Sequence, residues 1–306
     1  NQQFLMERGV YPTPMTNFGQ QQYLPASILR NGNYLAIARF DGLDPMIMFG
    51  TGGRTGHSAV TVWEGNTLYV VESTDANPFG KVYWPPPYGV IRTPWDQWYQ
   101  QAINASYHVD MLPIKPELAA QFNTTRFWSW FKTVQGMPYG YHNMLYSFMD
   151  TADPMQNFPQ PIDTNVFTWV VNTLDRLIPA TQEGVSVYSL FTQALNKRLG
   201  TSCQTIDCVL DALIPNGKNL GEAVAIPEQD EWMYGANYSM VCSVLAARAW
   251  QVGLGSALPS FEGSEQTPKD NYQMALFDPG FFNTTNCPIG LTNTPQGTYL
   301  SLIHIS

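Results

Sequence analysis

The chain has 306 residues, of which 44% are hydrophobic, so it can bury a sizeable core as one large domain or as a domain with an insertion. Its formal net charge is -9 with only 13% charged residues, which argues against nucleic acid as a partner. No apolar run approaches the roughly 18 residues that a membrane-spanning helix needs, so no transmembrane segment is expected.

The first part of the chain predicts β structure. Four short segments rich in β-branched and aromatic residues are separated by Gly, Asn and Asp, and we expect them to form an antiparallel meander. The segments are YLAIARF at 34–40, PMIMFGT at 45–51, HSAVTVWE at 57–64 and TLYVVEST at 67–74.

Helices and one more strand follow. Thr93, Pro94 and Asp96 indicate a helix that begins at Pro94, with Thr93 as the N-cap of a capping box. The segment SYHVDMLPI at 106–114 returns to strand, and residues 115–136 predict one amphipathic helix that ends at a glycine.

Aromatic side chains surround the proline-rich segment YWPPPYG. Trp84 and Tyr88 lie within it and Trp95 follows. Two interpretations stay open: these residues form an aromatic wall of a substrate site, or they cover the edge of the sheet as a rigid loop.

The second half predicts a helical insertion. A proline-punctuated loop leads to two segments with a 3.6-residue period, NVFTWVVNTLDRL and VSVYSLFTQALNKRL. The final hexamer, SLIHIS, resembles a translated sequencing adapter, and we expect it to lie outside the fold. The predicted organisation is a main domain at 1–150 and 226–300, a helical insertion at 151–225 and the hexamer at 301–306.

The cysteines and the glycosylation motifs bear on the compartment. Cys203 and Cys208 lie close together in CQTIDC, which fits either a small disulfide loop or half of a metal site. Cys287 is then unpaired or paired to one of them, and Cys242 is left over in either case. Together with the Asn-x-Ser/Thr motifs, this favours a secreted or lysosomal/vacuolar glycoprotein. The motifs begin at Asn104, Asn123, Asn237 and Asn283.

Cys242 is a candidate nucleophile. It lies in NYSMVCSVLAARAW, where Ser239 is a candidate N-cap that would place Cys242 in the first helical turn. A thiolate is favoured there by the helix dipole and by a nearby imidazolium. The alternative is that Cys242 is one small buried residue on an apolar helix.

A base must take the proton of the Cys242 thiol to form a thiolate, and His57 is the leading candidate. If Gly65-Asn66 is a two-residue hairpin turn, Ala59 pairs with Glu72, and His57 and Glu72 then share one face of the sheet. A three-residue loop would reverse this parity and favour Asp75. The two weaker candidates for the base are His108 and His142.

The order of these segments resembles the circularly permuted branch of the NlpC-type, papain-like cysteine hydrolases. The resemblance rests on TGHSAVTVWEGNTLYVVES, GVIRTPWDQWYQQA, GMPYGYHN and YSMVCSVLAARAW, and covers about 34–150 and 226–252. The segments PYGYHN, PEQDEWMYG and TPKDNYQMALFD also resemble those of a poorly characterised eukaryotic subgroup of this branch. One departure is the long segment between the Pro-Tyr turn and the cysteine.

The resemblance implies an α+β, papain-like antiparallel sheet packed against helices, with the helical insertion near the cleft. It implies Cys242 as nucleophile, His57 as base, Glu72 as the group that orients the imidazole, and Tyr139 in a turn near the site. It gives no cofactor and no metal.

The reaction that the resemblance implies is hydrolysis of an amide or isopeptide bond in a peptide or peptidoglycan-like substrate. A thioesterase or acyltransferase that acts on lipid acyl groups through the same triad is the second enzymatic interpretation. A non-catalytic papain-like binding module is the third. A separation of Cys242 and His57 by more than about 6 Å, with no rotamer that brings them into contact, would exclude the two enzymatic interpretations.

Overall fold

The computed structural model of the chain describes residues 2–7, 24–40, 44–74, 86–105, 107–140, 168, 171–172, 186–224, 226 and 239–278. The chain divides into two compact units. The sheet unit comprises Asn1–Tyr139, Cys242–Ser260 and Thr267–Ser306, and the helical unit comprises Gly140–Val241 and Phe261–Gln266. The predicted insertion at 151–225 falls within the helical unit. The hexamer at 301–306 lies outside the described residues.

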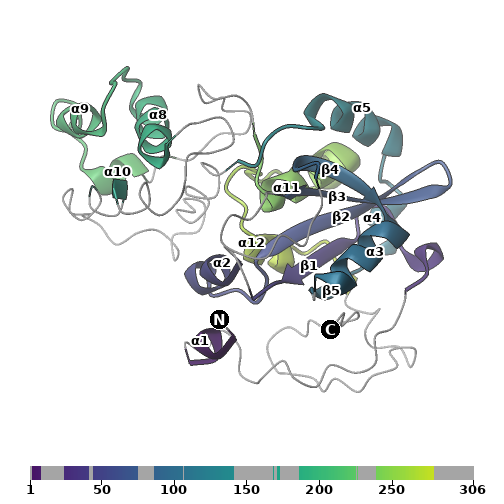
Figure 1. Ribbon diagram of the computed structural model, residues 1–306. Helices are drawn as coiled ribbons and strands as arrows, with labels where there is room; N and C mark the ends of the chain where they lie inside the picture. Colours follow the sequence, from purple (N-terminus) through teal and green to yellow (C-terminus); the bar gives the residue numbers. More distant parts are fainter. Residues whose placement is uncertain are drawn as a thin grey trace. The chain divides into compact units, whose positions relative to one another are not determined.

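A five-stranded antiparallel sheet forms the centre of the sheet unit, with strand order β4-β3-β2-β1-β5 (Figure 1). The predicted α+β class is therefore observed. Four predicted strand segments correspond to strands, and the fifth strand, β4, lies just ahead of the helix expected at Pro94. The strands are β1 (Tyr34–Ala38), β2 (His57–Glu64), β3 (Thr67–Thr74), β4 (Gly89–Pro94) and β5 (His108–Leu112).

Residues 45–51 are not a strand, as the sequence predicted, but belong to helix α2 (Asp44–Thr51). A short apolar run does not distinguish a strand from a buried helix, because neither period is visible in it. Two side chains favour the helix. Asp44 places a carboxylate in the first turn, where it also binds the Arg39 guanidinium at 2.8 Å, and Thr51 Oγ1 donates to Ile47 O in the last turn.

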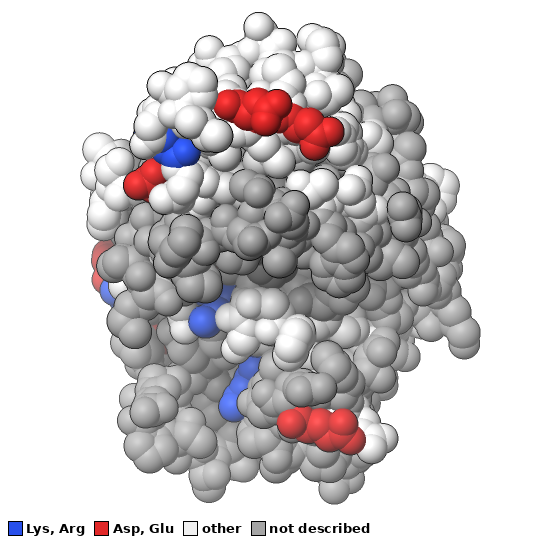
Figure 2. Space-filling model, turned by 90° about the vertical axis from the view of Figure 1, so that its left-hand side faces the viewer, with Lys and Arg blue, Asp and Glu red and all other residues white. Residues whose placement is uncertain are grey.

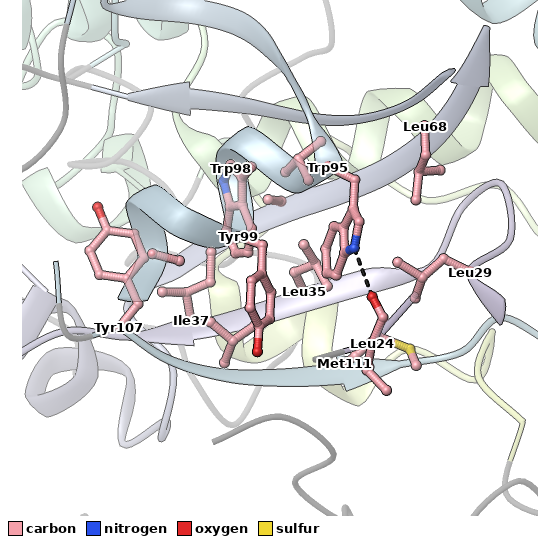
Figure 3. Close-up of a cluster of buried hydrophobic side chains, with 14 of the residues drawn as sticks. Leu24, Leu29, Leu35, Ile37, Leu68, Trp95, Trp98, Tyr99, Tyr107 and Met111 are labelled. Carbon is pink, nitrogen blue, oxygen red and sulfur yellow. Dashed lines mark hydrogen bonds between the residues drawn. The ribbon is translucent and has the colours of Figure 1, made fainter. Parts of the chain in front are cut away.

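Helix α3 (Trp95–Asn104) packs on one face of the sheet (Figure 3). Its aromatic side chains point into a cluster that draws residues from all five strands. Helix α11 (Cys242–Leu254) packs on the other face, because its Trp250 contacts the ring of Tyr34, and neighbouring strand residues point to opposite faces. The strand residues beneath α3 are Leu35, Ile37, Ala59, Leu68, Val70, Ile91, Val109 and Met111.

The start of α3 differs from the prediction by one residue. The helix begins at Trp95, Pro94 occupies the N-cap position, and no side chain caps the helix. Thr93 cannot act as the cap because it belongs to β4, where it pairs with Val70 of β3. The predicted capping box is therefore wrong, and the cause is strand pairing between residues distant in sequence.

The single helix predicted at 115–136 is divided into α4 (Pro116–Ala119) and α5 (Thr124–Val134). Asn123 makes the break. Its side-chain oxygen accepts a hydrogen bond from Arg126 N as the N-cap of α5, and its own N–H donates to Gly253 O at the end of α11. The second contact is tertiary and leaves no periodic signal in the sequence.

The helical unit contains α8 (Val187–Leu199), α9 (Ile206–Asp211) and α10 (Leu220–Val224). The α8 helix confirms the second of the two predicted helical segments. Cys203 and Cys208 form a disulfide at the start of α9, which decides between the two interpretations of CQTIDC. Disulfides are usual in oxidising compartments, and the predicted secreted or lysosomal/vacuolar location stays a prediction.

The remaining described elements are short. They are the helices α1 (Gln2–Glu7) and α12 (Pro268–Gln273) and the 3-10 helices at Ala26–Ile28 and Gly255–Ala257. None of the described helices combines the length and the hydrophobicity needed to cross a membrane. Figure 2 shows one face of the molecule, on which the described charged side chains are few and the basic ones form no extended patch.

Candidate active site

Cys242 is the first residue of the 13-residue helix α11. Its predicted place in the first turn is therefore confirmed, but Ser239 is not the N-cap, because Val241 is the residue directly before the helix. The N–H groups of a first turn have no acceptor within the helix and point toward its N-terminal end. The thiol is free and 2% exposed, so it lies beside these donors in a site nearly closed to water.

His57 and Glu72 meet as the hairpin register predicts. Ala59 pairs with Glu72, and Glu64 pairs with Thr67 across the Gly65-Asn66 turn, so the two-residue turn is confirmed. His57 Nε2 and Glu72 Oε2 lie 2.8 Å apart. Both side chains are buried, the imidazole at 6% and the carboxylate at 1% exposure. A buried carboxylate this close fixes both the orientation and the tautomer of the ring.

The second oxygen of the Glu72 carboxylate is also occupied. Trp98 Nε1 of α3 donates to Glu72 Oε1 at 2.7 Å, so each oxygen has its own partner (Figure 3 shows Trp98). Because the indole ring is fully buried in the core on this face, it holds the carboxylate in one orientation. Trp98 was not among the site residues predicted from the sequence. The available signal was its position three residues after Trp95, on the same side of an amphipathic helix.

Cys242 also lies near enough to His57 to raise the pKa of the imidazole. Since Nε2 lies beside Glu72, Nδ1 is the ring nitrogen that does not bond the carboxylate. Burial alone lowers the pKa of His57, because desolvation disfavours the cation. The interactions with Cys242 and then with Glu72 outweigh burial and raise the pKa of His57 from 6.5 to about 10. The charged, imidazolium form of His57 is therefore favoured at neutral pH.

Tyr139 is a further residue that lies close to the Cys242 thiol. Its hydroxyl lies 3.9 Å from Cys242 Sγ, so the turn that carries Tyr139 adjoins the thiol, as the resemblance implied. Hydrogen bonds connect this turn to the start of β4: Val90 N donates to Met137 O at 2.8 Å, and Gly136 N donates to Val90 O at 2.9 Å.

Gly89 permits this close approach. Its φ is +85°, and a Cβ at this position would lie 2.1 Å from Met137 O. Any other residue would thus be strained in its backbone and would also displace the turn. The glycine that begins β4 therefore helps to determine where the Tyr139 hydroxyl lies.

The other predicted site residues have different outcomes. Trp84, Asp75 and His142 lie outside the described residues. Tyr88 is half-buried, and Trp95 is a core residue whose indole donates to Leu24 O at 2.9 Å. His108 lies at the start of β5 on the far edge of the sheet, where burial lowers its pKa.

Comparisons of the chain with protein-family models, with curated proteins and with solved structures found no match. Within the described part of the chain, no group of three or more His, Cys, Asp or Glu side chains could hold a metal ion. The fold and the site together define an α+β protein that brings a buried thiol, an imidazole and a carboxylate into contact. Chemically, this arrangement can deliver a thiolate and return a proton at the same place.

Proposed function

We propose that this protein is a cysteine-dependent hydrolase of amide or isopeptide bonds, with Cys242 as nucleophile, His57 as acid and base, and Glu72 as the orienting group. One observation carries the proposal: the imidazole of His57 bonds Glu72 through Nε2 and interacts with Cys242 at the N-terminus of a buried helix. The papain-like order of strand histidine, acid and helix cysteine supports the choice of an amide bond.

The structure contains one feature that a core cysteine does not require. Burying a carboxylate and an imidazole costs free energy unless each is paired, and an apolar pair of similar size would avoid that cost. Here Glu72 and His57 are both buried and paired with each other, and Cys242 lies near enough to raise the pKa of the imidazole. A structural role for Cys242 alone leaves this arrangement unexplained.

The proposed reaction begins with attack of the Cys242 thiolate on the carbonyl carbon. A C–S bond forms and the oxygen becomes an oxyanion, for which the Cys242 backbone N–H is the natural donor at the helix N-terminus. His57 then gives its proton to the leaving nitrogen, the C–N bond breaks, and an acyl-enzyme remains. A water molecule attacks the thioester while His57 takes its proton, the C–S bond breaks, and the carboxylic acid leaves.

The first experiment measures the reactivity of Cys242 against pH, by mass spectrometry that resolves each cysteine. Iodoacetamide suits a thiol that is only 2% exposed, because the reagent is small. A free thiol is only about 0.3% thiolate at pH 6, since its pKa is about 8.5. We expect Cys242 to be alkylated at pH 6 at least about tenfold faster than a free thiol, and to lose this advantage in His57→Ala.

His108→Ala is the matched control, because it removes a strand histidine away from the thiol. It should leave the pH profile of Cys242 labelling unchanged. Labelling that follows an ordinary thiol, or that is absent whether or not His57 is present, would overturn the proposal and favour a binding module. With the expected profile in hand, amide substrates and acyl esters are compared directly, and a preference for esters would favour the acyl-transfer alternative.

A further inference from the structure

Asn271 of α12 joins the two elements that carry the proposed base and nucleophile. It is fully buried. Its Nδ2 donates to Ser243 O at 2.9 Å and to Ser58 Oγ at 3.4 Å. Ser243 directly follows Cys242 in α11, and Ser58 directly follows His57 in β2. One side-chain amide therefore binds the neighbour of the thiol and the neighbour of the imidazole.

The α12 helix is itself held firmly. Thr267 and Asp270 form a reciprocal capping box at its start. Tyr34 of β1 donates its hydroxyl hydrogen to Pro268 O at 3.1 Å and lies 2.9 Å from Ser58 Oγ. Burial raises the pKa of Tyr34 above its ordinary value of 10, so the phenol keeps its proton as a donor. A closed set of hydrogen bonds thus connects α12, β1 and β2.

The hydrogen-bonding groups of the Asn271 side chain suit a position between a helix and a strand. An Asn side chain offers two N–H donors on one nitrogen, and two acceptors lie within reach, one on the helix and one on the strand. The oxygen of the amide lowers the stability of the fold, because Asn271 Oδ1 is buried and has no hydrogen-bond partner among the described residues. A leucine of similar volume would fill the space without that cost, so packing alone does not explain the asparagine.

We infer that Asn271 is a positioning residue of the proposed cysteine hydrolase: it sets the separation between α11 and β2 and thereby the contact between Cys242 and His57. The inference rests on the proposed function and adds a third structural element to the site. Asn271 itself touches neither substrate nor the reacting atoms. It acts through the backbone at Ser243 and the hydroxyl at Ser58.

Asn271→Leu tests the inference, because it keeps the volume and removes both donors. The measured quantity is the ratio of the Cys242 alkylation rate at pH 6 to the rate at pH 9, which is unaffected by general changes in access. Misplacement of reacting groups by about 1 Å costs up to about 100-fold in rate. We expect this ratio to fall by at least about tenfold in Asn271→Leu, with a melting temperature close to that of the wild type.

Asn33→Leu is the matched control. Asn33 is equally buried, but its side chain accepts from Ile114 N and donates to Met111 Sδ, at the β5 side of the sheet. This variant leaves a backbone N–H without its partner, so it should be less stable than Asn271→Leu, yet it should keep the wild-type ratio. Ser58→Ala removes only the hydroxyl arm of the contact, and we expect a smaller fall in the ratio.

The outcomes separate the two proposals. If the wild type shows no His57-dependent labelling at pH 6, the proposed hydrolase fails, and this inference fails with it. If the wild type shows that labelling but Asn271→Leu and Ser58→Ala both keep the wild-type ratio, the hydrolase stands and the positioning role is overturned. Should Asn271→Leu fail to fold, Ser58→Ala alone decides between these results.

Discussion

Cys203 and Cys208 of the helical unit form a disulfide, whereas Cys242 of the sheet unit is a free thiol beside an imidazole. The disulfide joins residues that are close in sequence and limits the unfolded chain. The thiol lies at the start of a helix and contacts a residue from a distant strand. The same residue type therefore forms a cross-link in one unit and a free thiol near an imidazole in the other, and its neighbours decide which.

The two units also differ in what their cores contain. The core cluster of the helical unit contains residues such as Leu195, Ile206 and Val209, and the buried Arg198 of this unit donates to backbone carbonyls. The sheet unit buries His57, Glu72 and Asn271 beside its apolar cluster, each with hydrogen-bond partners. Buried polar groups are costly when one partner is lost. Substitutions that break a buried pair should therefore be much more harmful in the sheet unit than substitutions of surface pairs.

The largest effect is expected for Glu72→Gln. The amide keeps the volume of the carboxylate but removes the negative charge that Glu72 places beside the His57 imidazolium in a buried site. Loss of one partner of a buried pair costs about 3–5 kcal/mol. The free energy of unfolding, measured by denaturant titration at pH 7, should fall by that amount.

Glu64→Gln is the control for this change. Glu64 of β2 pairs with Arg92 of β4, on either side of the strand that carries Glu72, and their side chains are much more exposed, at 35% for Glu64 and 28% for Arg92. A surface pair contributes about 0–1 kcal/mol, so this variant should be nearly as stable as the wild type. Similar losses in the two variants would contradict the importance of burial at Glu72.

A smaller effect is expected for the double variant Cys203→Ser, Cys208→Ser. Closing so short a loop removes little entropy from the unfolded chain, so its loss should cost about 2 kcal/mol. The change should appear as a lower melting temperature, and the pH profile of Cys242 labelling should not move. A changed pH profile would show that the disulfide influences the Cys242 thiol, and would contradict the separate roles of the cysteines in the two units.

The finest comparison follows the protonation of two histidines by NMR. The pKa of His57 is raised to about 10, whereas burial lowers the pKa of His108, so at pH 8 the first should be charged and the second neutral. The pKa of His57 in the folded protein exceeds the unfolded value of about 6.5. Its proton therefore stabilises the fold fully below pH 6.5, and this contribution is lost as the pH rises through about 10.

The variant Cys242→Ala provides the internal check on that titration. Because the interactions with Cys242 are the larger of the two favourable contributions, the pKa of His57 should drop in this variant, while that of His108 stays in place. Two histidines that titrate alike in the wild type would remove the basis for an imidazolium at neutral pH.

Local sequence was sufficient for the central hairpin. Gly65 has a positive φ of 58° at the turn, and the period of two residues then fixes which side chains share a face. The contact between His57 and Glu72 follows from that turn alone. The helix that begins at Cys242 was also predictable from its composition, although its cap was not, because Ser239 lies too far before the first turn.

Local sequence failed where a short pattern fits two kinds of structure. Residues 45–51 form a helix in spite of their strand-like composition, and Thr93 pairs with β3 in place of capping α3. In both cases a short segment has two locally acceptable conformations that differ little in free energy. For Thr93 the pairing with Val70 of β3 makes the choice, and a contact between residues so distant in sequence is invisible to propensity.

The sequence by itself determined the α+β class, the hairpin that brings His57 to Glu72, and the place of Cys242 near a helix start. Each of these depends on periodicity or on a turn within a few residues. Only the tertiary structure decided that Trp98 holds the second oxygen of Glu72, and that Asn271 joins α11 to β2. These contacts connect residues far apart in the chain, and their geometry exists only after the helices have packed on the sheet.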